Sequence, residues 1–231
     1  MRNFEEERRR LVERLRAQGV GSEEVLAALG RVKRHLFVPQ HLAEQAYADY
    51  PLPIGEGQTI SAPHIVALMC TYLELRRGEK VLEIGAGSGY HAAVVAELVG
   101  EEGQVYSVER VEWLAEFARA NLRRAGYTQA SEGVVRGDGT LGLPEHAPYD
   151  KISVACAAPD VPPPLLEQLR AGGKMVIPIG KFMQTLYLVK KEKGKEKERE
   201  RQEGREEVVR ERKCSVVFVP LVGRYGFREE D

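Results

Sequence analysis

Residues 81–90 read Val81-Leu-Glu-Ile-Gly-Ala-Gly-Ser-Gly-Tyr90 and carry the clearest structural signal of the chain. An apolar run of strand type leads directly into a glycine-rich turn, and a helical pattern follows from Tyr90 to Val99. Glycines let the chain turn sharply and let a ligand approach the backbone, while the start of the following helix offers unpaired N–H groups. The stretch therefore predicts a site for a nucleotide-like ligand at the end of a β-strand.

The spacing of these glycines disfavours a dinucleotide. The dinucleotide fingerprint requires Gly or Ala three positions after its second glycine, and Tyr90 occupies that position here. The third glycine, Gly89, comes one residue early, so binding of a pyrophosphate is not expected. If the glycine loop is considered alone, the alternative to a ligand site is a turn with only a structural role.

Alternating strand and helix patterns extend outward from this stretch in both directions. Apolar runs lie at residues 80–85, 104–108, 133–136 and 151–155, and helical patterns lie at residues 64–75, 90–99 and 111–125. Short β-rich runs separated by helices are typical of a parallel sheet that is covered on both faces. The predicted fold class is therefore α/β, with a doubly wound, Rossmann-like sheet.

Segments on both sides of this pattern depart from its rhythm. Two short helices are predicted at residues 4–17 and after Ser22, and the Pro- and Gly-rich stretch 50–63 is predicted to be a long structured loop. Residues 174–178, 184–189 and 215–221 read as strands. We expect one domain over residues 1–231: N-terminal helices and an active-site loop (1–63), a cofactor-binding core (64–180) and a C-terminal β-hairpin subdomain (181–231).

A highly charged segment, residues 190–213, separates the last two of these strands. It contains eleven basic and eight acidic residues, for a net charge of +3. Such a segment cannot bury a core of its own, so it either extends into solvent as two hairpin arms or forms a mobile loop. A nucleic-acid-binding arm is the sharper alternative, but the interspersed Glu residues cancel most of the field that a phosphate backbone would need.

The composition is that of a globular chain of 231 residues, 43% hydrophobic and 30% charged. The 34 Lys and Arg residues against 35 Asp and Glu residues give a net charge of −1, which provides no general attraction to nucleic acid or membranes. Cys70, Cys156 and Cys214 are widely spaced, and no stretch approaches the ~20 apolar residues of a membrane span. We expect a soluble, cytoplasmic monomer with no nucleic-acid or membrane partner.

The histidines give no sign of a metal site. His35, His41, His91 and His146 share no metal-ligand spacing, and no metal is predicted.

Acidic residues follow two further strands of the predicted sheet. Glu109 ends the second apolar run, twenty-four residues beyond Gly85, about where an acidic side chain accepts hydrogen bonds from ribose hydroxyls in this fold class. Asp138, within Gly137-Asp-Gly139, follows the third run, where it could meet an adenine amino group. Singly, Glu109 could be a surface residue at a helix start, and Gly137-Asp-Gly139 a plain turn. Together with the glycine loop they predict a site for S-adenosyl-L-methionine, because open α/β sheets bind ligands at the carboxyl ends of their strands.

The sequence resembles the protein-L-isoaspartate (D-aspartate) O-methyltransferase family over nearly its whole length. The resemblance is carried by Arg34-His-Leu-Phe-Val-Pro39, Ala46–His64, Leu82–Tyr90, Gly137-Asp-Gly139, Pro144–Asp150 and Val217-Phe-Val-Pro-Leu221. Gln58-Thr-Ile-Ser-Ala-Pro63 is specific to that family among methyltransferases. Ala86 stands where the family often has Thr, and His91 where Gln is frequent.

This resemblance implies methyl transfer from S-adenosyl-L-methionine to the free carboxylate of L-isoaspartyl or D-aspartyl residues in damaged proteins and peptides. It assigns Ser61 to the active site. It implies that the cofactor and its product S-adenosyl-L-homocysteine contact Ser61, His64, Glu83, Gly85, Gly87, Ser88, Glu109, Gly137 and Asp138. We expect substrate contacts from Ile54, Gln58, Thr59 and Ile60, in an open groove. Its other expected walls are the turns at residues 157–159 and 219–221, for which simple packing is the alternative.

The chemistry of such a reaction limits what the site must supply. A carboxylate with a pKa of about 4 is ionised at neutral pH, so it needs no general base, and the Ser61 hydroxyl would act as a donor that orients it. The alternative for Ser61 is a cap on the helix that starts near Pro63. For the whole chain, one alternative is another S-adenosylmethionine-dependent methyltransferase that acts on RNA or a small molecule. A second is a binding module in which the charged arm engages RNA or another partner.

Overall fold

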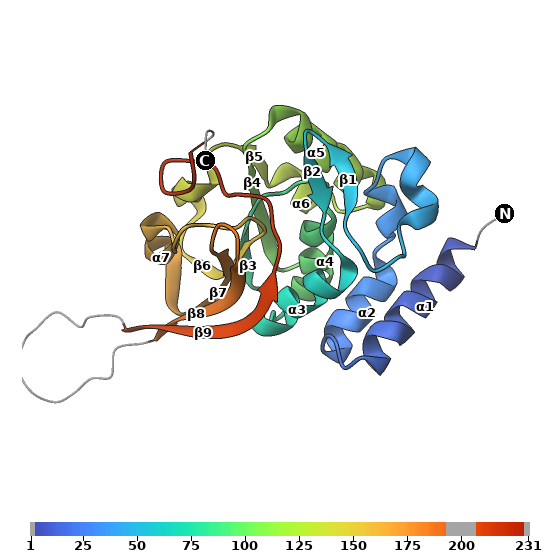
Figure 1. Cartoon of the computed structure of the whole chain (residues 1–231), viewed down its shortest axis with the longest axis horizontal. Helices are drawn as coiled ribbons and strands as arrows, with labels where there is room; N and C mark the ends of the chain where they lie inside the picture. The colour runs from blue at the N-terminus through green and yellow to red at the C-terminus, as the bar shows by residue number, and fades with distance from the viewer. Residues whose placement is uncertain (1–2, 193–206, 229–231) are drawn as a thin grey trace, which may run out of the picture.

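A seven-stranded sheet lies at the centre of the computed structural model, which describes residues 3–192 and 207–228 (Figure 1). Its strands are β3 (Lys80–Ile84), β4 (Gln104–Glu109), β5 (Val134–Arg136), β6 (Tyr149–Val154), β7 (Leu169–Ile179), β8 (Gln184–Glu192) and β9 (Glu207–Val216). They are ordered β5-β4-β3-β6-β7-β8-β9. Strands β3 to β7 are parallel, whereas β8 and β9 are each antiparallel to the strand before them. The predicted Rossmann-like α/β fold is confirmed.

Both faces of the parallel strands are buried, which explains their continuous apolar runs. Val81 and Leu82 are neighbours in β3 and are both 0% exposed, yet they belong to two different core clusters. Successive side chains of a strand point to opposite faces, so the two clusters lie on the two sides of the sheet. Helices therefore cover the sheet on both sides.

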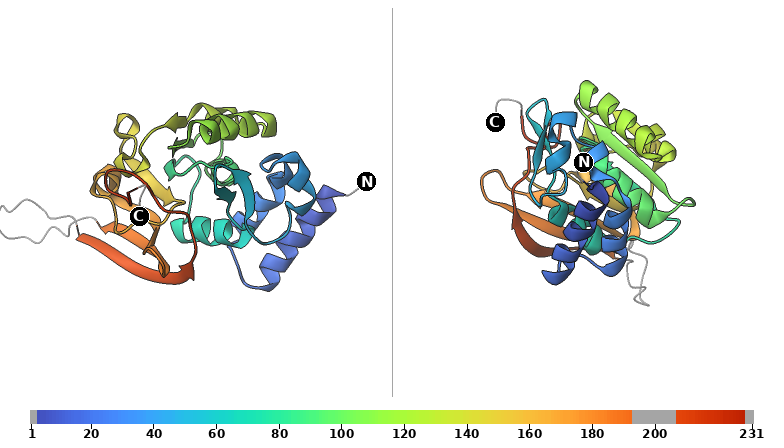
Figure 2. Two further views of the ribbon diagram at one scale, coloured as in Figure 1. Left: turned by 45° about the horizontal axis from the view of Figure 1, so that its top comes forward. Right: turned by 90° about the vertical axis from the view of Figure 1, so that its right-hand side faces the viewer.

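Of the five covering helices that the structure describes, three were expected from the sequence: α3 (Pro63–Leu73), α4 (Tyr90–Val99) and α5 (Glu112–Ala125). The other two are α6 (Thr128–Glu132) and α7 (Pro163–Gln168). Helices α3, α4 and α5 contribute to the core cluster of Val81, whereas Leu165 of α7 packs in the cluster of Leu82. Figure 2 shows this layered arrangement from two further sides. The sequence predicted neither α6 nor α7, which are both shorter than two turns.

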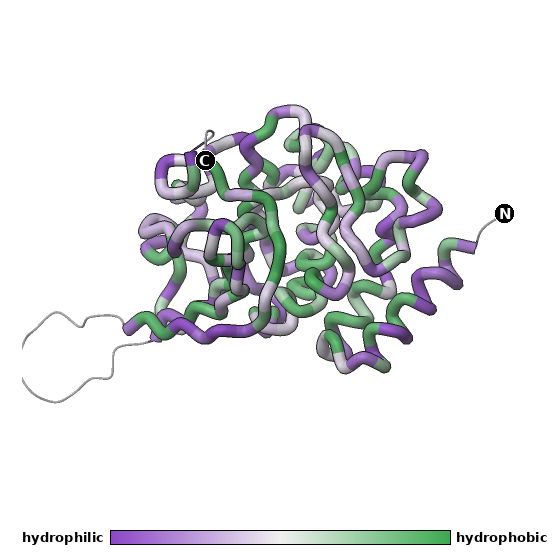
Figure 3. Tube along the Cα trace, in the orientation of Figure 1, coloured by the Kyte–Doolittle hydropathy of each residue, from purple (hydrophilic) through white to green (hydrophobic). Residues whose placement is uncertain are grey.

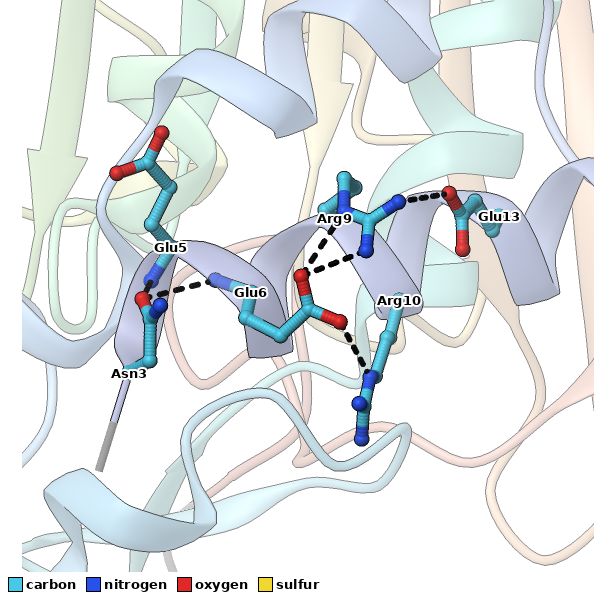
Figure 4. A network of polar contacts seen from close by, with 6 residues as sticks. All are labelled: Asn3, Glu5, Glu6, Arg9, Arg10 and Glu13. Atoms are coloured by element: carbon cyan, nitrogen blue, oxygen red, sulfur yellow. Dashed lines mark hydrogen bonds and ion pairs between the residues drawn. The ribbon is translucent and has the colours of Figure 1, made fainter.

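Two helices precede the sheet, as predicted: α1 (Phe4–Ala17) and α2 (Glu23–Arg31). The side chain of Asn3 caps α1 by accepting hydrogen bonds from the backbone N–H groups of Glu5 and Glu6, each at 3.2 Å. Charged side chains one turn apart then pair along its exposed face (Figure 4). Exposed pairs of this kind contribute little to stability. The buried side chains Leu11 and Leu15 hold α1 against the rest of the protein.

The stretch predicted as a long loop contains a small β-hairpin. Strands β1 (Leu52–Gly55) and β2 (Gln58–Ile60) pair antiparallel, and 3₁₀ turns η1 (Arg34–Leu36) and η2 (Gln40–Gln45) precede them. Glu56 and Gly57 connect the strands with φ values of +52° and +68°. Two successive residues of positive φ are typical of the tight turn that joins twisted hairpin strands. The prolines did not prevent strand formation, because a two-stranded ribbon leaves its outer edges unpaired.

The last third of the chain corrects one predicted strand. Residues 215–221 were predicted as one strand, but β9 ends at Val216 and the chain then leaves the sheet. The side chain of Gln184 accepts a hydrogen bond from Phe218 N at 2.6 Å and donates one to Phe218 O at 2.9 Å. These side-chain bonds replace the backbone partners that a longer β9 would need. Beyond them, Ala157 pairs with residues 219–221, through Ala157 N to Val219 O and Leu221 N to Ala157 O.

The expected C-terminal hairpin is formed by β8 and β9, and it continues the main sheet. Both ends of the charged segment belong to it, since β8 extends to Glu192 and β9 begins at Glu207. Residues 193–206, on which the predictions of a mobile loop or a nucleic-acid arm also rest, lie outside the described residues. Within the described ranges, no helix has the length and apolar character needed to cross a bilayer.

Candidate active site

A cleft opens at the carboxyl ends of β3, β4 and β6, the edge at which the sequence predicts a ligand site. It encloses about 850 Å³, including its open mouth. Its walls are the glycine turn after β3, the residues after β4 and β6, the end of the β1–β2 hairpin and the segment after β9. Figure 1 shows the β1–β2 hairpin and the segment after β9 on opposite sides of the middle of the molecule. The site thus combines parts of the chain that are more than 150 residues apart.

The glycine turn is shaped as its sequence suggests. Gly85, Gly87 and Gly89 have φ values of +89°, +53° and +82°, a region that other residues rarely adopt. A Cβ atom at Gly85 would lie 2.8 Å from Cys156 Sγ. At this position glycine is therefore required both by the backbone conformation and by the close approach of the turn after β6. The backbone at Gly85 and Gly87 borders the cleft with no side chain in between.

Glu109 stands at the end of β4 with its carboxylate facing the glycine turn. The carboxylate accepts hydrogen bonds from Gly87 N at 2.9 Å and from Val111 N at 3.0 Å. The residue is 7% exposed and lines the cleft. Each carboxylate oxygen has a second lone pair, so two further donors can still be accepted. This arrangement favours a binding role over the alternative of a surface residue at a helix start.

Beneath the glycine turn, a buried acid belongs to the cleft wall. Glu83 is 0% exposed, and its Oε2 accepts a hydrogen bond from the Ser107 hydroxyl at 2.6 Å. Within the described residues its Oε1 atom has no hydrogen-bond partner, and His91 Nδ1 is 3.9 Å away. Burial lowers the pKa of His91 to about 4, so this ring is neutral. A buried carboxylate oxygen without a partner is costly, and it is suited to a positively charged or donating ligand group in the cleft.

Burial raises the pKa of Glu83 to about 8; the Ser107 hydrogen bond opposes this shift and the charge of Glu109 adds to it. In the unfolded chain the group ionises near its ordinary pKa of 4.5, so the folded state binds its proton more tightly. The stabilisation by that proton is complete below about pH 4.5 and is lost as the pH rises through about 8. The Glu83→Gln variant lacks this titration. We therefore expect the difference in thermal unfolding midpoint, variant minus wild type, to increase from pH 5 to pH 9 in the absence of cofactor, because only the wild type loses stabilisation over this range.

Scanning calorimetry of both proteins across this pH range measures the effect. Glu112→Gln serves as the control, because Glu112 is exposed and pairs with Arg136 at the surface. A difference between Glu83→Gln and wild type that stays constant with pH would show that Glu83 is already ionised in the folded protein.

Ser61 lines the cleft between β2 and α3. The alternative that it caps α3 is wrong, since the N-cap residue is Ala62 and no side chain of the cap position is bonded to the helix. Asp49 caps α3 instead: its Oδ1 accepts a hydrogen bond from His64 N and is 2.9 Å from His64 Nδ1. Among the residues that the structure describes, nothing hydrogen-bonds the Ser61 hydroxyl. The hydroxyl is therefore available to a ligand in the cleft.

Nine of the residues expected at the site line this cleft: Gln58, Thr59, Ile60, Ser61, Glu83, Gly85, Gly87, Ser88 and Glu109. Four others are placed elsewhere. His64 is held by Asp49 beside the cleft, and Ile54 is 0% exposed in the core, where it packs behind Gly87. Ile54 therefore supports the glycine turn and has no exposed surface for a substrate.

Gly137 and Asp138 also lie outside the cleft lining. Asp138 Oδ1 accepts hydrogen bonds from the N–H and the hydroxyl of Thr140, at 2.9 and 2.7 Å, and Oδ2 accepts one from Arg224 N at 2.8 Å. The carboxylate thus ties the chain after β5 to the C-terminal segment that forms one wall of the cleft. A Cβ atom at Gly223 would lie 2.0 Å from Asp138 Oδ1, so this attachment requires glycine there.

The structure also places residues at the cleft that the sequence did not single out. They include Val66, Tyr90, Arg110, Val111, Leu114 and Cys156. Arg110 and Val111 directly follow Glu109, and Cys156 follows β6, so their place after a parallel strand was a usable signal. Burial raises the pKa of the Cys156 thiol to about 12, which keeps it neutral and excludes it as a nucleophile.

Tyr90 connects the cleft to the N-terminal part of the chain. Its ring is buried, and the guanidinium of Arg34 lies 4.7 Å from the ring centroid. Arg34 is itself 0% exposed and donates from Nε to Ala46 O at 2.8 Å. This cation–π contact fixes the segment before β1 against the first residue of α4. The contact thereby helps to position the β1–β2 hairpin, which directly precedes Ser61.

The chain resembles proteins of one family over nearly its whole length. The family described as Protein-L-isoaspartate(D-aspartate) O-methyltransferase (PCMT) matches residues 6–226. A protein-L-isoaspartate O-methyltransferase of Methanothrix thermoacetophila is 56% identical over 220 residues, which cover 95% of this chain and 97% of that protein. Protein-L-isoaspartate O-methyltransferase 1 of Archaeoglobus fulgidus is 55% identical over 226 residues, 98% of each chain.

Solved structures give the same result. A protein-L-isoaspartate O-methyltransferase has a TM-score of 0.80 at 32% identity, covering 95% of this chain and 67% of that chain. A Plasmodium falciparum chain assigned to PCMT, in complex with S-adenosyl-L-homocysteine, has a TM-score of 0.79 at 26% identity and covers 96% of this chain and 99% of that chain. With its cleft, its glycine turn and these matches, the chain belongs to the protein-L-isoaspartate(D-aspartate) O-methyltransferase family.

Proposed function

We propose that the protein transfers a methyl group from S-adenosyl-L-methionine to the free carboxylate of L-isoaspartyl and D-aspartyl residues in damaged proteins and peptides. The observation that carries this proposal is the match of residues 6–226 to one family, together with a cleft that joins the glycine turn to Ser61. The match includes Gln58–Ser61, so it is not confined to the cofactor half. This favours an isoaspartyl acceptor over RNA or a small molecule.

The residues of the cleft fit the cofactor. At Gly85 the backbone borders the cleft, and a side chain there would collide with Cys156. Glu109 has lone pairs left for ribose hydroxyls. The Glu83 Oε1 atom, which has no hydrogen-bond partner within the described residues, suits an ammonium group. When bound, S-adenosyl-L-methionine supplies an activated methyl group on a sulfonium, and S-adenosyl-L-homocysteine is the product. We assign its binding to the cleft residues Ser61, Glu83, Gly85, Gly87, Ser88 and Glu109. We also propose that His64, Gly137 and Asp138, which lie beside the cleft lining, contact the cofactor; among the described residues Asp138 Oδ2 accepts only one hydrogen bond, and it can accept another.

The acceptor carboxylate needs orientation and little else. It is ionised at neutral pH, so no group has to remove a proton from it. The free hydroxyl of Ser61 donates a hydrogen bond that aligns one carboxylate oxygen with the methyl group, and the apolar cleft walls exclude part of the water. Gln58, Thr59 and Ile60 contact the peptide beside Ser61. No step of this mechanism requires the neutral thiol of Cys156.

The product ester leads to repair without further help from the enzyme. The backbone nitrogen that follows the methylated residue attacks the ester carbonyl, a succinimide ring closes and methanol leaves. Water then opens the ring, and part of the product is a normal aspartyl residue. The remaining isoaspartyl product can be methylated again.

We further propose that the chain acts as a monomer in the cytoplasm and as one functional unit over residues 1–231. In this division, residues 1–63 provide the N-terminal helices and the active-site loop, residues 64–180 the cofactor-binding core, and residues 181–231 the C-terminal hairpin. Supporting it, the cleft takes residues from each of the three parts. Its partners in this scheme are isoaspartyl-containing proteins and peptides, with no nucleic acid, membrane or metal involved.

A matched pair of peptides tests the function. The purified protein is incubated with methyl-labelled S-adenosyl-L-methionine and two peptides that differ only in an aspartyl or isoaspartyl linkage. We expect label in the isoaspartyl peptide alone. Equal labelling of both peptides would contradict the proposed acceptor, and failure to label either, with no cofactor binding by calorimetry, would contradict the methyltransferase assignment.

A further inference from the structure

Three apolar side chains project almost completely into solvent. Phe182 and Met183 are each 91% exposed and Val217 is 93% exposed. The next most exposed large apolar side chain in the described part of the chain is Trp113, at 50%. Removing apolar surface from water is favourable, so three such side chains in one place indicate a contact with another molecule.

The three residues come from two segments that lie side by side. Phe182 and Met183 form the turn between β7 and β8, and Val217 is the first residue after β9. Gln184 pairs with Val216 in the sheet, and its side chain holds both the N–H and the carbonyl of Phe218. The turn is therefore attached beside the segment after β9. We name Phe182, Met183 and Val217 the apolar ledge.

The ledge lies at the same edge of the sheet as the candidate active site and two residues from its lining along the chain. Residues 219–222 line the cleft, and Val217 lies two residues before them on the same extended segment. Figure 3 shows the stretch directly after β9 as mostly hydrophobic, whereas β9 itself alternates between hydrophilic and hydrophobic parts. The turn at residues 180–183 follows the carboxyl end of β7, so it lies at the same edge of the sheet as the cleft. A chain that leaves the cleft across the segment after β9 would meet the ledge directly.

We propose that the apolar ledge binds an apolar side chain of the substrate polypeptide, close in sequence to the isoaspartyl residue. This inference rests on the proposed function, because only a polypeptide acceptor extends beyond the cleft on both sides of the reacting residue. The chemistry of the ledge selects the occupant, since an apolar flanking side chain gains from contact with it and a polar one does not. Apolar side chains are mostly buried in intact proteins, so the ledge directs the enzyme to unfolded or locally open segments.

Peptide pairs that differ in their flanking residues test this proposal. One isoaspartyl peptide carries Ser at the flanking positions, and a series carries one Leu moved stepwise through those positions. We expect the best Leu peptide to exceed the Ser peptide about tenfold in kcat/KM, because a single apolar side chain is partly removed from water. The gain should appear in KM. In the Phe182→Ser/Met183→Ser double variant the ratio should fall to about one.

Control variants show whether the ledge itself provides the preference. Val208→Ser is the matched control, since Val208 is exposed at the far end of β9 and should leave the ratio at the wild-type value. Phe182→Leu/Met183→Leu keeps the ledge apolar and should retain the preference. An unchanged ratio in the serine double variant would overturn the proposal. A concentration-dependent dimer that the serine variant abolishes would also overturn it, by assigning the ledge to a second copy of the chain.

Different results would contradict the proposed role of the ledge and the proposed function. Methylation of the Ser-flanked isoaspartyl peptide by the wild type supports the proposed function whatever the ledge does. Methylation of every peptide at the same kcat/KM leaves that function intact and contradicts the ledge alone.

Discussion

Replacing Glu109 with glutamine should raise the dissociation constant for S-adenosyl-L-homocysteine about a hundredfold, because hydrogen bonds to a charged acceptor contribute ~1.5–3 kcal/mol. Glu109 accepts bonds from Gly87 N and Val111 N and has lone pairs left for a ribose. A glutamine presents an NH₂ group in place of one oxygen, so it must turn a donor toward a backbone donor or toward the ribose. The variant thus loses charge and also disturbs the glycine turn.

Isothermal titration calorimetry with the product as ligand measures this change without turnover. Glu112→Gln, three residues further along the chain, removes an equal charge from an exposed side chain and should shift the dissociation constant by less than about twofold. If Glu109→Gln bound the product as tightly as the wild type, the cofactor ribose would have to lie away from the end of β4.

Replacing Ser61 with alanine should lower kcat about a hundredfold, because a small loss of alignment between reacting groups costs on the order of 10²-fold in rate. The hydroxyl has no partner within residues 3–192 and 207–228, so its removal leaves no protein group unsatisfied and should not disturb the fold. Cofactor affinity should change by less than about threefold, since Glu109 and the glycine turn remain intact. Turnover at saturating cofactor and isoaspartyl peptide separates these two effects.

Ser215→Ala provides a matched loss of a hydroxyl on the exposed surface of β9 and should leave kcat unchanged. The role assigned to Ser61 is wrong if its alanine variant loses cofactor affinity while saturated enzyme turns over normally. The orientation role also fails if Ser61→Ala and Ser215→Ala have the same kcat.

The glycine-turn half of the candidate site was predictable because its signals are local. A strand, three closely spaced glycines and a helix start follow one another directly at residues 80–90, and the backbone conformation of those glycines depends on neighbours in the chain. Glu109 was found for a similar reason, since it ends the next strand of a parallel sheet. The connection of these parts required only the standard topology of the fold.

Asp138 and Ile54 have contacts that local reasoning did not predict. Asp138 follows a strand as Glu109 does, yet its carboxylate is already bonded to Thr140 and to the backbone of Arg224. Ile54 lies in the segment that matches the family, but alternation along β1 turns it into the core. The bond from Arg224 N to Asp138 and the choice of the buried face of β1 cannot be read from neighbouring residues, because both depend on contacts with distant parts of the chain.

The α/β class, the glycine turn and the resemblance to the family could be read from the amino-acid sequence, since strand and helix periodicity and turn conformation arise from residues close in the chain. The three-dimensional fold was needed to show that Asp49, and not Ser61, caps α3, and that the segment after β9 leaves the sheet to line the cleft. It also shows which apolar residues remain exposed beside that cleft. These features depend on pairings across 15 to more than 80 residues, whose partners are selected by packing of the whole molecule.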